Sequence, residues 1–155
     1  MSNNIKFKKF FTIIAYIAVF SYLFNFVWES FHSVYLYNLP DFSLKEFISL
    51  INHVSSVDAL MITGIYFIIS LLFRDFIWIE NLNFRKISTF IGVCLIFALW
   101  VEYRGVFLLK KWSYSHLMPT IFGFGLSPLI QLFTTGIIAI LFINKLTKNN
   151  KRYKK

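Results

Sequence analysis

The sequence predicts an all-α membrane protein, in which four membrane-spanning helices form one bundle and a single domain covering residues 1–155. Hydrophobic residues make up 57% of the chain and charged residues only 15%, whereas a soluble domain carries about 25% charged residues. Four apolar stretches approach the length of about 20 residues that a spanning helix requires. Lys and Arg residues collect outside these stretches, which sets the boundaries of the bundle.

The first span is predicted at 10–31, and its helix is expected to continue to Tyr37, before Asn38-Leu39-Pro40. No small-residue cleavage site follows the apolar run, so this segment is expected to stay uncleaved rather than serve as a signal peptide. Residues 38–53 are predicted to form a loop with a short interfacial helix over 43–51. The second span is predicted at 54–73.

A short polar turn over 74–86, with Trp78 at the membrane interface, leads to the third span, predicted at 87–107. Cys94 lies within this span and is expected to be a small packing residue. The fourth span is predicted at 125–144. Pro and Gly residues argue against a regular helix over 115–126, and irregular backbone at membrane depth must be buried in protein or line a cavity. That segment is therefore predicted to fold over, or re-enter, the outer end of the bundle.

The distribution of positive charge predicts that both termini are cytoplasmic. With this orientation the inner segments hold 12 Lys and Arg residues and the outer loops hold 4, as the positive-inside rule requires. We expect a multi-pass protein of a cell inner membrane, with membrane lipids as partners of its basic C-terminal tail. No nucleic-acid partner is expected, since no nucleic-acid-reading motif accompanies the charge.

Four polar residues, one in each span, are predicted to share one depth near the outer face: Glu29, Asp58, Glu102 and Gln131. Ionisable residues inside spans are costly and usually face the bundle interior or a wet cavity. Each also has an ordinary alternative. Glu29 would lie among lipid headgroups, Asp58 would be an acid at a helix N-terminus, and Glu102 would pair with Arg104 or Lys110. These alternatives leave the common depth unexplained, so a shared polar pocket is the preferred hypothesis.

The candidate catalytic residues are Glu29, Asp58 and Glu102, because a protonated carboxyl beside an ionised one supplies a general acid and a general base. The candidate ligand-binding residues are Asn25, His32, Arg104, Trp112, Tyr114 and Gln131. Ser21, Asn25, Glu29 and His32 lie on one face of the first span.

Glu29-x-x-His32 matches the spacing of a di-iron ligand pair, but no second Glu-x-x-His pair exists. A mononuclear site built from Glu29, His32, Asp58 and Glu102 is the alternative, while our prediction is that the protein holds no metal and no cofactor.

Several motifs resemble those of a family of small four-span bacterial inner-membrane proteins. They are Trp112-x-Tyr114, Met118-Pro119 and Gly125-Leu126-Ser127-Pro128-Leu129-x-Gln131, together with the three acids. The resemblance implies a bacterial inner-membrane protein and carries no activity with it. The aromatic motif followed by a Pro-led span is also similar to membrane lycopene cyclases, but their acid pair after the Pro is replaced here by Ile130 and Gln131.

Two functions follow from these patterns. The first is a pocket that binds or modifies a lipid or isoprenoid-like ligand, with Trp112 and Tyr114 as gating residues. The second is a non-enzymatic transporter component or an assembly or structural protein of the membrane. Four spans are few for an independent transporter, so the second function favours a homo-oligomer. Contact between the carboxylates and Arg104, Lys110 or Lys111 would favour the structural function, whereas an open cavity would favour the ligand.

Overall fold

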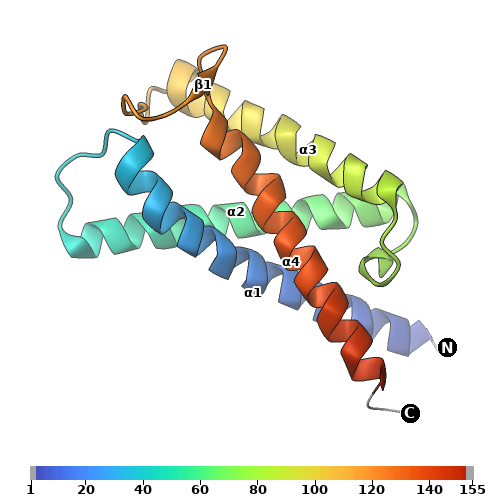
Figure 1. Ribbon diagram of the computed structural model, residues 1–155. Coiled ribbons are helices and arrows are strands. Elements are labelled where there is room, and N and C mark those ends of the chain that lie inside the picture. The colour runs from blue at the N-terminus through green and yellow to red at the C-terminus, as the bar shows by residue number, and fades with distance from the viewer. Residues whose placement is uncertain (1–2, 153–155) are drawn as a thin grey trace.

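The computed structural model describes residues 3–152, which form four long helices packed as a bundle (Figure 1). Helix α1 spans Asn3–Leu36, α2 spans Leu44–Leu72, α3 spans Phe84–Glu102 and α4 spans Leu126–Arg152. A six-residue π-helical segment, η2, extends α3 over Tyr103–Leu108. All four helices are long and apolar enough to cross a membrane, so the chain is a multi-pass membrane protein.

Helix α2 begins earlier than the sequence analysis predicts. The interfacial helix expected over 43–51 and the span expected at 54–73 are one continuous helix of 29 residues. Ser43 caps it and forms a capping box with Glu46, which satisfies backbone N–H groups that the first turn leaves free. Asp58 therefore lies at the midpoint of α2, and the interpretation of it as an N-terminal acid is wrong.

The helices cross at different inclinations. In Figure 1, α2 runs across α1 and α4, while α1 begins and α4 ends at the same end of the molecule. Helix α1 packs against α2 and α4, and α3 packs mainly against α4. Gly136 permits a close approach at the centre of α4, where an added Cβ would lie only 2.8 Å from Cζ of Phe90. Small residues at such crossings are typical of membrane helix packing.

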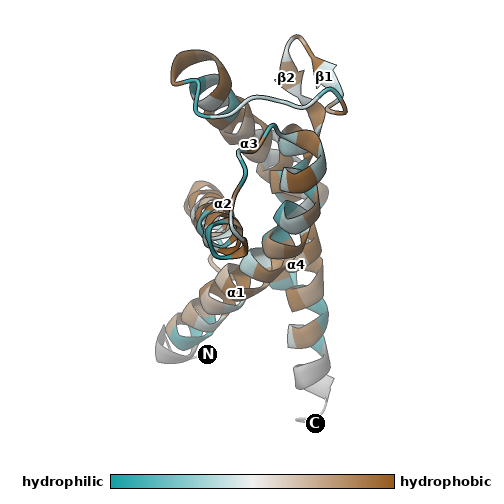
Figure 2. Cartoon of the chain, turned by 90° about the vertical axis from the view of Figure 1, so that its left-hand side faces the viewer, coloured by the Kyte–Doolittle hydropathy of each residue, from teal (hydrophilic) through white to brown (hydrophobic). Residues whose placement is uncertain are grey.

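The core lies in the half of the bundle nearer the ends of the chain. Its fully buried side chains come from all four helices and include Ile17, Ile65, Phe90, Cys94 and Ile143. Burial of Cys94 confirms its predicted packing role. Apolar residues run along most of each helix (Figure 2), and many large apolar side chains are exposed, as expected for surfaces that contact lipid.

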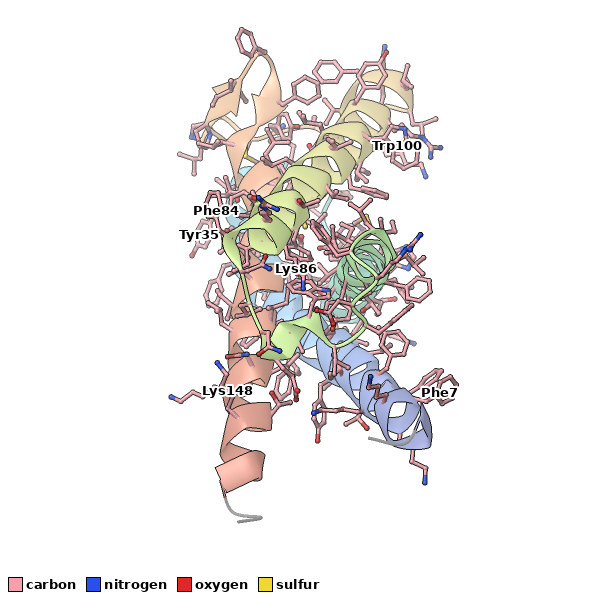
Figure 3. The ribbon with its side chains drawn as sticks, turned by 90° about the vertical axis from the view of Figure 1, so that its right-hand side faces the viewer. Phe7, Tyr35, Phe84, Lys86, Trp100 and Lys148 are labelled. Carbon is pink, nitrogen blue, oxygen red and sulfur yellow. The ribbon has the colours of Figure 1, made fainter. Side chains whose placement is uncertain are left out.

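The turn between α2 and α3 differs from the expected interfacial segment. Trp78, in the short helix η1 (Trp78–Glu80), is completely buried and stacks on Tyr66 with ring centroids 4.9 Å apart. Lys9 forms an ion pair with Glu80 at 2.6 Å, and Lys86, which points inward in Figure 3, pairs with Asp75 at 2.6 Å. The turn thus closes this end of the bundle instead of anchoring Trp78 at the membrane interface.

At the opposite end, residues 109–125 form an irregular segment with a small hairpin, as the Pro and Gly residues predict. Strand β1 (Thr120–Ile121) pairs with β2 (Phe124–Gly125), and both turn residues, Phe122 and Gly123, have positive φ. The segment is tied to α1 by backbone hydrogen bonds from Ser115 to Leu36 and from Asn38 to Ser113, each 3.0 Å. These bonds hold the segment against the C-terminal end of α1 and the residues that follow it.

Candidate functional site

The four polar residues predicted to share a depth converge at this end of the bundle. Glu29, Asp58, Glu102 and Gln131 all line one pocket of about 470 Å³. Because α2 crosses the bundle obliquely, its midpoint reaches residues near the C-terminal ends of α1 and α3 and the N-terminal end of α4. The pocket is thus built from the four spans together, as the shared-pocket hypothesis requires.

Gln131 is the hub of the polar cluster. Its Nε2 donates to Oε1 of Glu29 at 2.6 Å, to Oδ2 of Asp58 at 3.0 Å and to Oδ1 of Asn25 at 3.1 Å. Thr135, one turn further along α4, donates to the same Asn25 oxygen at 3.2 Å. One side chain of α4 therefore holds polar groups of α1 and α2 in place.

The polar stripe of α1 faces inward along its whole length. Ser21 and Asn25 are fully buried, Glu29 is 8% exposed and His32 is 5% exposed. Ser33 donates to Oε2 of Glu29 at 2.9 Å, while Nδ1 of His32 lies 3.6 Å from the same oxygen. The alternative in which Glu29 lies solvated among headgroups is wrong.

Glu102 occupies the other side of the pocket and is held by two tyrosines. Tyr114 donates to its Oε2, and Tyr37 donates to its Oε1 at 3.4 Å. Burial and the adjacent Glu102 carboxylate raise the pKa of both Tyr37 and Tyr114 above the ordinary tyrosine range. Both phenols therefore remain neutral donors at physiological pH.

The alternative in which Glu102 pairs with Arg104 is wrong. The Arg104 guanidinium lies over the Trp100 ring, 4.8 Å from its centroid, and both side chains are exposed on the outside of α3 and η2. Arg104 is thus the one candidate ligand-binding residue that is neither in the pocket lining nor in contact with it. Lys111 lies at the pocket rim, but no ion pair joins it or Lys110 to a carboxylate within residues 3–152.

Trp112 lies directly in the pocket lining, and its position depends on the π-helical segment. An added Cβ on Gly105 would lie 1.8 Å from Cζ2 of Trp112, so the indole occupies the space that a side chain at this position would need. π-Helical turns of this kind are frequent at functional sites.

Apolar side chains form the remaining walls. The pocket is also lined by Val57 and Met61 of α2, Ala98 and Val101 of α3, and Leu132 of α4. Val57 is 41% exposed, so the lining reaches the molecular surface on α2. The pocket thus combines a carboxylate cluster with apolar walls.

Several contributing residues were not among the predicted site residues. Ser33 and Tyr37 follow Glu29 at intervals of four residues, so the helical period would have placed them on the same face. His53 lines the pocket from the part of α2 that was expected to be a loop. Its position could be assigned only once α2 was known to start at Leu44.

The metal-binding alternative is not supported by the arrangement of the side chains. Within residues 3–152, no three His, Cys, Asp or Glu side chains come together with the geometry of a metal site. Glu29 and His32 are adjacent, but Glu102 and Asp58 are directed at other partners.

Comparisons with known proteins identify no family for this chain. No protein-family model, no curated protein and no solved structure matches the chain. The fold and the site together define a four-span membrane protein with a carboxylate-lined pocket at one end of its bundle.

Proposed function

We propose that this protein is a bacterial inner-membrane protein whose pocket, near the outer face, binds or chemically modifies a lipid or isoprenoid-like ligand. Glu29, Asp58 and Glu102 act as acid, base or electrostatic groups. Asn25, His32 and Gln131 orient them, and Trp112 and Tyr114 gate the opening.

One observation carries this proposal: the pocket combines three carboxylates with apolar walls. Ligand pockets of about 300–1,000 Å³ with apolar walls and a few convergent polar groups are typical of small-molecule sites. The volume of about 470 Å³ lies within that range. An apolar ligand could enter beside Val57 without crossing the polar loop.

A second candidate function, a non-enzymatic transporter component or assembly protein, is favoured by a different observation. Gln131 donates to both Glu29 and Asp58, so part of the cluster is already satisfied by the protein. Wide apolar faces of α1 and α3 would then pack against other subunits of a homo-oligomer. Within the described part of the chain, Lys110, Lys111 and Arg104 form no ion pair with the pocket carboxylates. This observation weighs against the second function.

The test is to identify molecules that co-purify with the protein and to ask whether they depend on the pocket. The protein is extracted in a mild detergent, and bound molecules are identified by mass spectrometry. Val101→Phe fills the pocket from α3, and Ile96→Phe is its matched control, since Ile96 lies on the same helix and is 66% exposed.

A specific lipid or isoprenoid retained by the wild type and Ile96→Phe but lost from Val101→Phe is expected. Equal recovery from all three proteins would favour the structural alternative, provided that circular dichroism shows Val101→Phe to be folded.

A further inference from the structure

The acidic end of the pocket has more hydrogen-bond acceptors than donors. The Gln131 amide has two N–H hydrogens but faces three acceptor oxygens, those of Glu29, Asp58 and Asn25, at 2.6–3.1 Å. A carboxylate offers about four acceptor positions, and Ser33 supplies one further donor to Glu29. Acceptor positions on Asp58 and Glu29 thus remain for a donor that the protein does not provide.

His32 adds an independent sign that a group is missing from the cluster. Among the residues that the structure describes, neither buried ring nitrogen has a hydrogen-bond partner, and the side chain is only 5% exposed. Nδ1 is directed toward Glu29 at 3.6 Å, and the ring lies against Tyr37, whose side chain lines the pocket. Buried polar groups without partners are rare, and each calls for an explanation such as a water, a bound ion or a functional role.

The negative charge of the carboxylate cluster indicates the charge that its missing partner carries. A buried carboxylate must be paired with a cation or take up a proton. The Lys side chains that form ion pairs within residues 3–152 bond Glu80 and Asp75 at the other end of the bundle. An anionic head group would meet three acids at this site, whereas a cationic one would both offset their charge and donate to their free acceptor positions.

We propose that the pocket selects a ligand with a protonated amine at its polar end and an apolar chain at the other. The inference rests on the proposed function, because it specifies the class of ligand for the same pocket. The ammonium group donates to Asp58, Glu29 and Glu102, and its three N–H bonds supply the donors that the cluster lacks. The chain lies along Val57, Met61 and Val101. A phosphate attached to the amine, as in an ethanolamine lipid, would meet Lys111 at the rim.

The experiment uses four twelve-carbon amphiphiles that differ only in the head group. Radiolabelled n-dodecylamine is bound to the full-length protein in phosphatidylcholine nanodiscs, and empty nanodiscs correct for partition into lipid. Unlabelled dodecanol, dodecanoate and dodecyltrimethylammonium compete. Replacing part of the phosphatidylcholine with phosphatidylethanolamine then distinguishes an ethanolamine lipid from a free amine.

Asp58→Asn is the test variant, because it removes one charge with little change in shape. Asp41→Asn is the matched control, since Asp41 is exposed in the loop between α1 and α2 and outside the pocket lining. If Asp58→Asn does not fold, Glu102→Gln replaces it.

Saturable dodecylamine binding is expected, weakened about tenfold or more by Asp58→Asn, as for loss of one partner of a desolvated charge pair, and unchanged by Asp41→Asn. Dodecanoate is expected not to compete. Weak competition by the quaternary ammonium would show that N–H donation matters in addition to charge.

Two outcomes separate failure of this inference from failure of the proposed function. If dodecanol and dodecanoate compete as well as the amine, and Val101→Phe abolishes binding of all of them, the pocket binds amphiphiles without selecting an amine. If the protein binds none of the probes above the empty-nanodisc level, both the inference and the proposed function are overturned.

Discussion

Replacing Gln131 by Leu should destabilise the bundle strongly, because one amide joins polar groups of three helices. Leu is close to Gln in size, so the substitution removes the donors without opening a large cavity. It leaves Glu29, 8% exposed, without its α4 partner, while Oδ1 of fully buried Asn25 keeps only the hydrogen bond from Thr135. Asp58 loses the same partner but can still be hydrated from the pocket.

The expected loss of unfolding free energy depends on the number of amide hydrogens of Gln131, not on the number of its short contacts. The amide can make two full hydrogen bonds, and bonds to charged groups contribute about 1.5–3 kcal/mol each. Neutral hydrogen bonds between membrane helices average only about 0.6 kcal/mol, because partners are also available in the unfolded state. Hydration of Asp58 further reduces the loss, so about 2–4 kcal/mol of unfolding free energy is expected.

The assay is reversible unfolding in mixed dodecyl maltoside and sodium dodecyl sulfate micelles, followed by helical circular dichroism. Thr134→Leu is the control, since Thr134 is a half-buried polar residue on the same helix, outside the cluster. Glu29→Gln in the Gln131→Leu background should restore part of the loss, because it removes the carboxylate that lacks a donor. A coupling energy of about 1–2 kcal/mol is expected, as for residues that share one network.

The reasoning would be refuted if Gln131→Leu changed the unfolding free energy no more than Thr134→Leu does. Strict additivity of Gln131→Leu and Glu29→Gln would also refute it, because it would mean that the two side chains do not interact in the folded protein.

Two further predictions concern packing and orientation. Gly136→Ala should lower the unfolding free energy by about 1–3 kcal/mol through overpacking against Phe90. Gly64→Ala is the control, since its new Cβ would meet nothing within 4 Å, and it should raise the unfolding free energy slightly through helix propensity. Equal effects of the two substitutions in the micelle assay would contradict the close approach of Gly136 and Phe90. In a Cys94→Ser background, a cysteine at Lys148 should be labelled only from the cytoplasm and one at Lys45 only from outside, and the opposite pattern would overturn the charge-based orientation.

The membrane class, four spans and the convergence of the polar residues could be predicted from the sequence for one physical reason. Burying Glu29 or Glu102 in lipid is so costly that each must face a protein interior, and four helices have a single interior. The start of α2 was missed because mean hydropathy falls over 44–53, where polar residues such as Lys45, Glu46 and Asn52 interrupt the apolar pattern. The S-x-x-E capping box at Ser43 was the local signal for the true start.

The error at α2 also had a consequence for Asp58, which was expected near a helix end. Its contact with Gln131 does not come from equal distance to the helix ends, because Asp58 is the middle residue of its helix. It comes from the oblique crossing of α2, and crossing angles depend on small contact residues such as Gly136, whose packing partners do not follow from local sequence.

The contacts within the site are the part that sequence reasoning could least supply. Which donor serves which acid depends on side-chain positions across helices that are about 100 residues apart in the chain, as for Gln131 and Glu29. The π-helical segment has no clear sequence signal either, apart from Gly105, whose missing side chain accommodates the Trp112 ring. Helical periodicity assigns residues to one face of a helix, and a face that carries an acid inside a span is enough to predict a polar pocket. Periodicity does not say whether basic side chains of the protein pair with the acids. Within the described residues, the Lys ion pairs lie at the other end of the bundle, while His32 lies 3.6 Å from Glu29 and Lys111 lies at the pocket rim without an ion pair. A positively charged ligand would supply the cation that Asp58 and Glu102 lack.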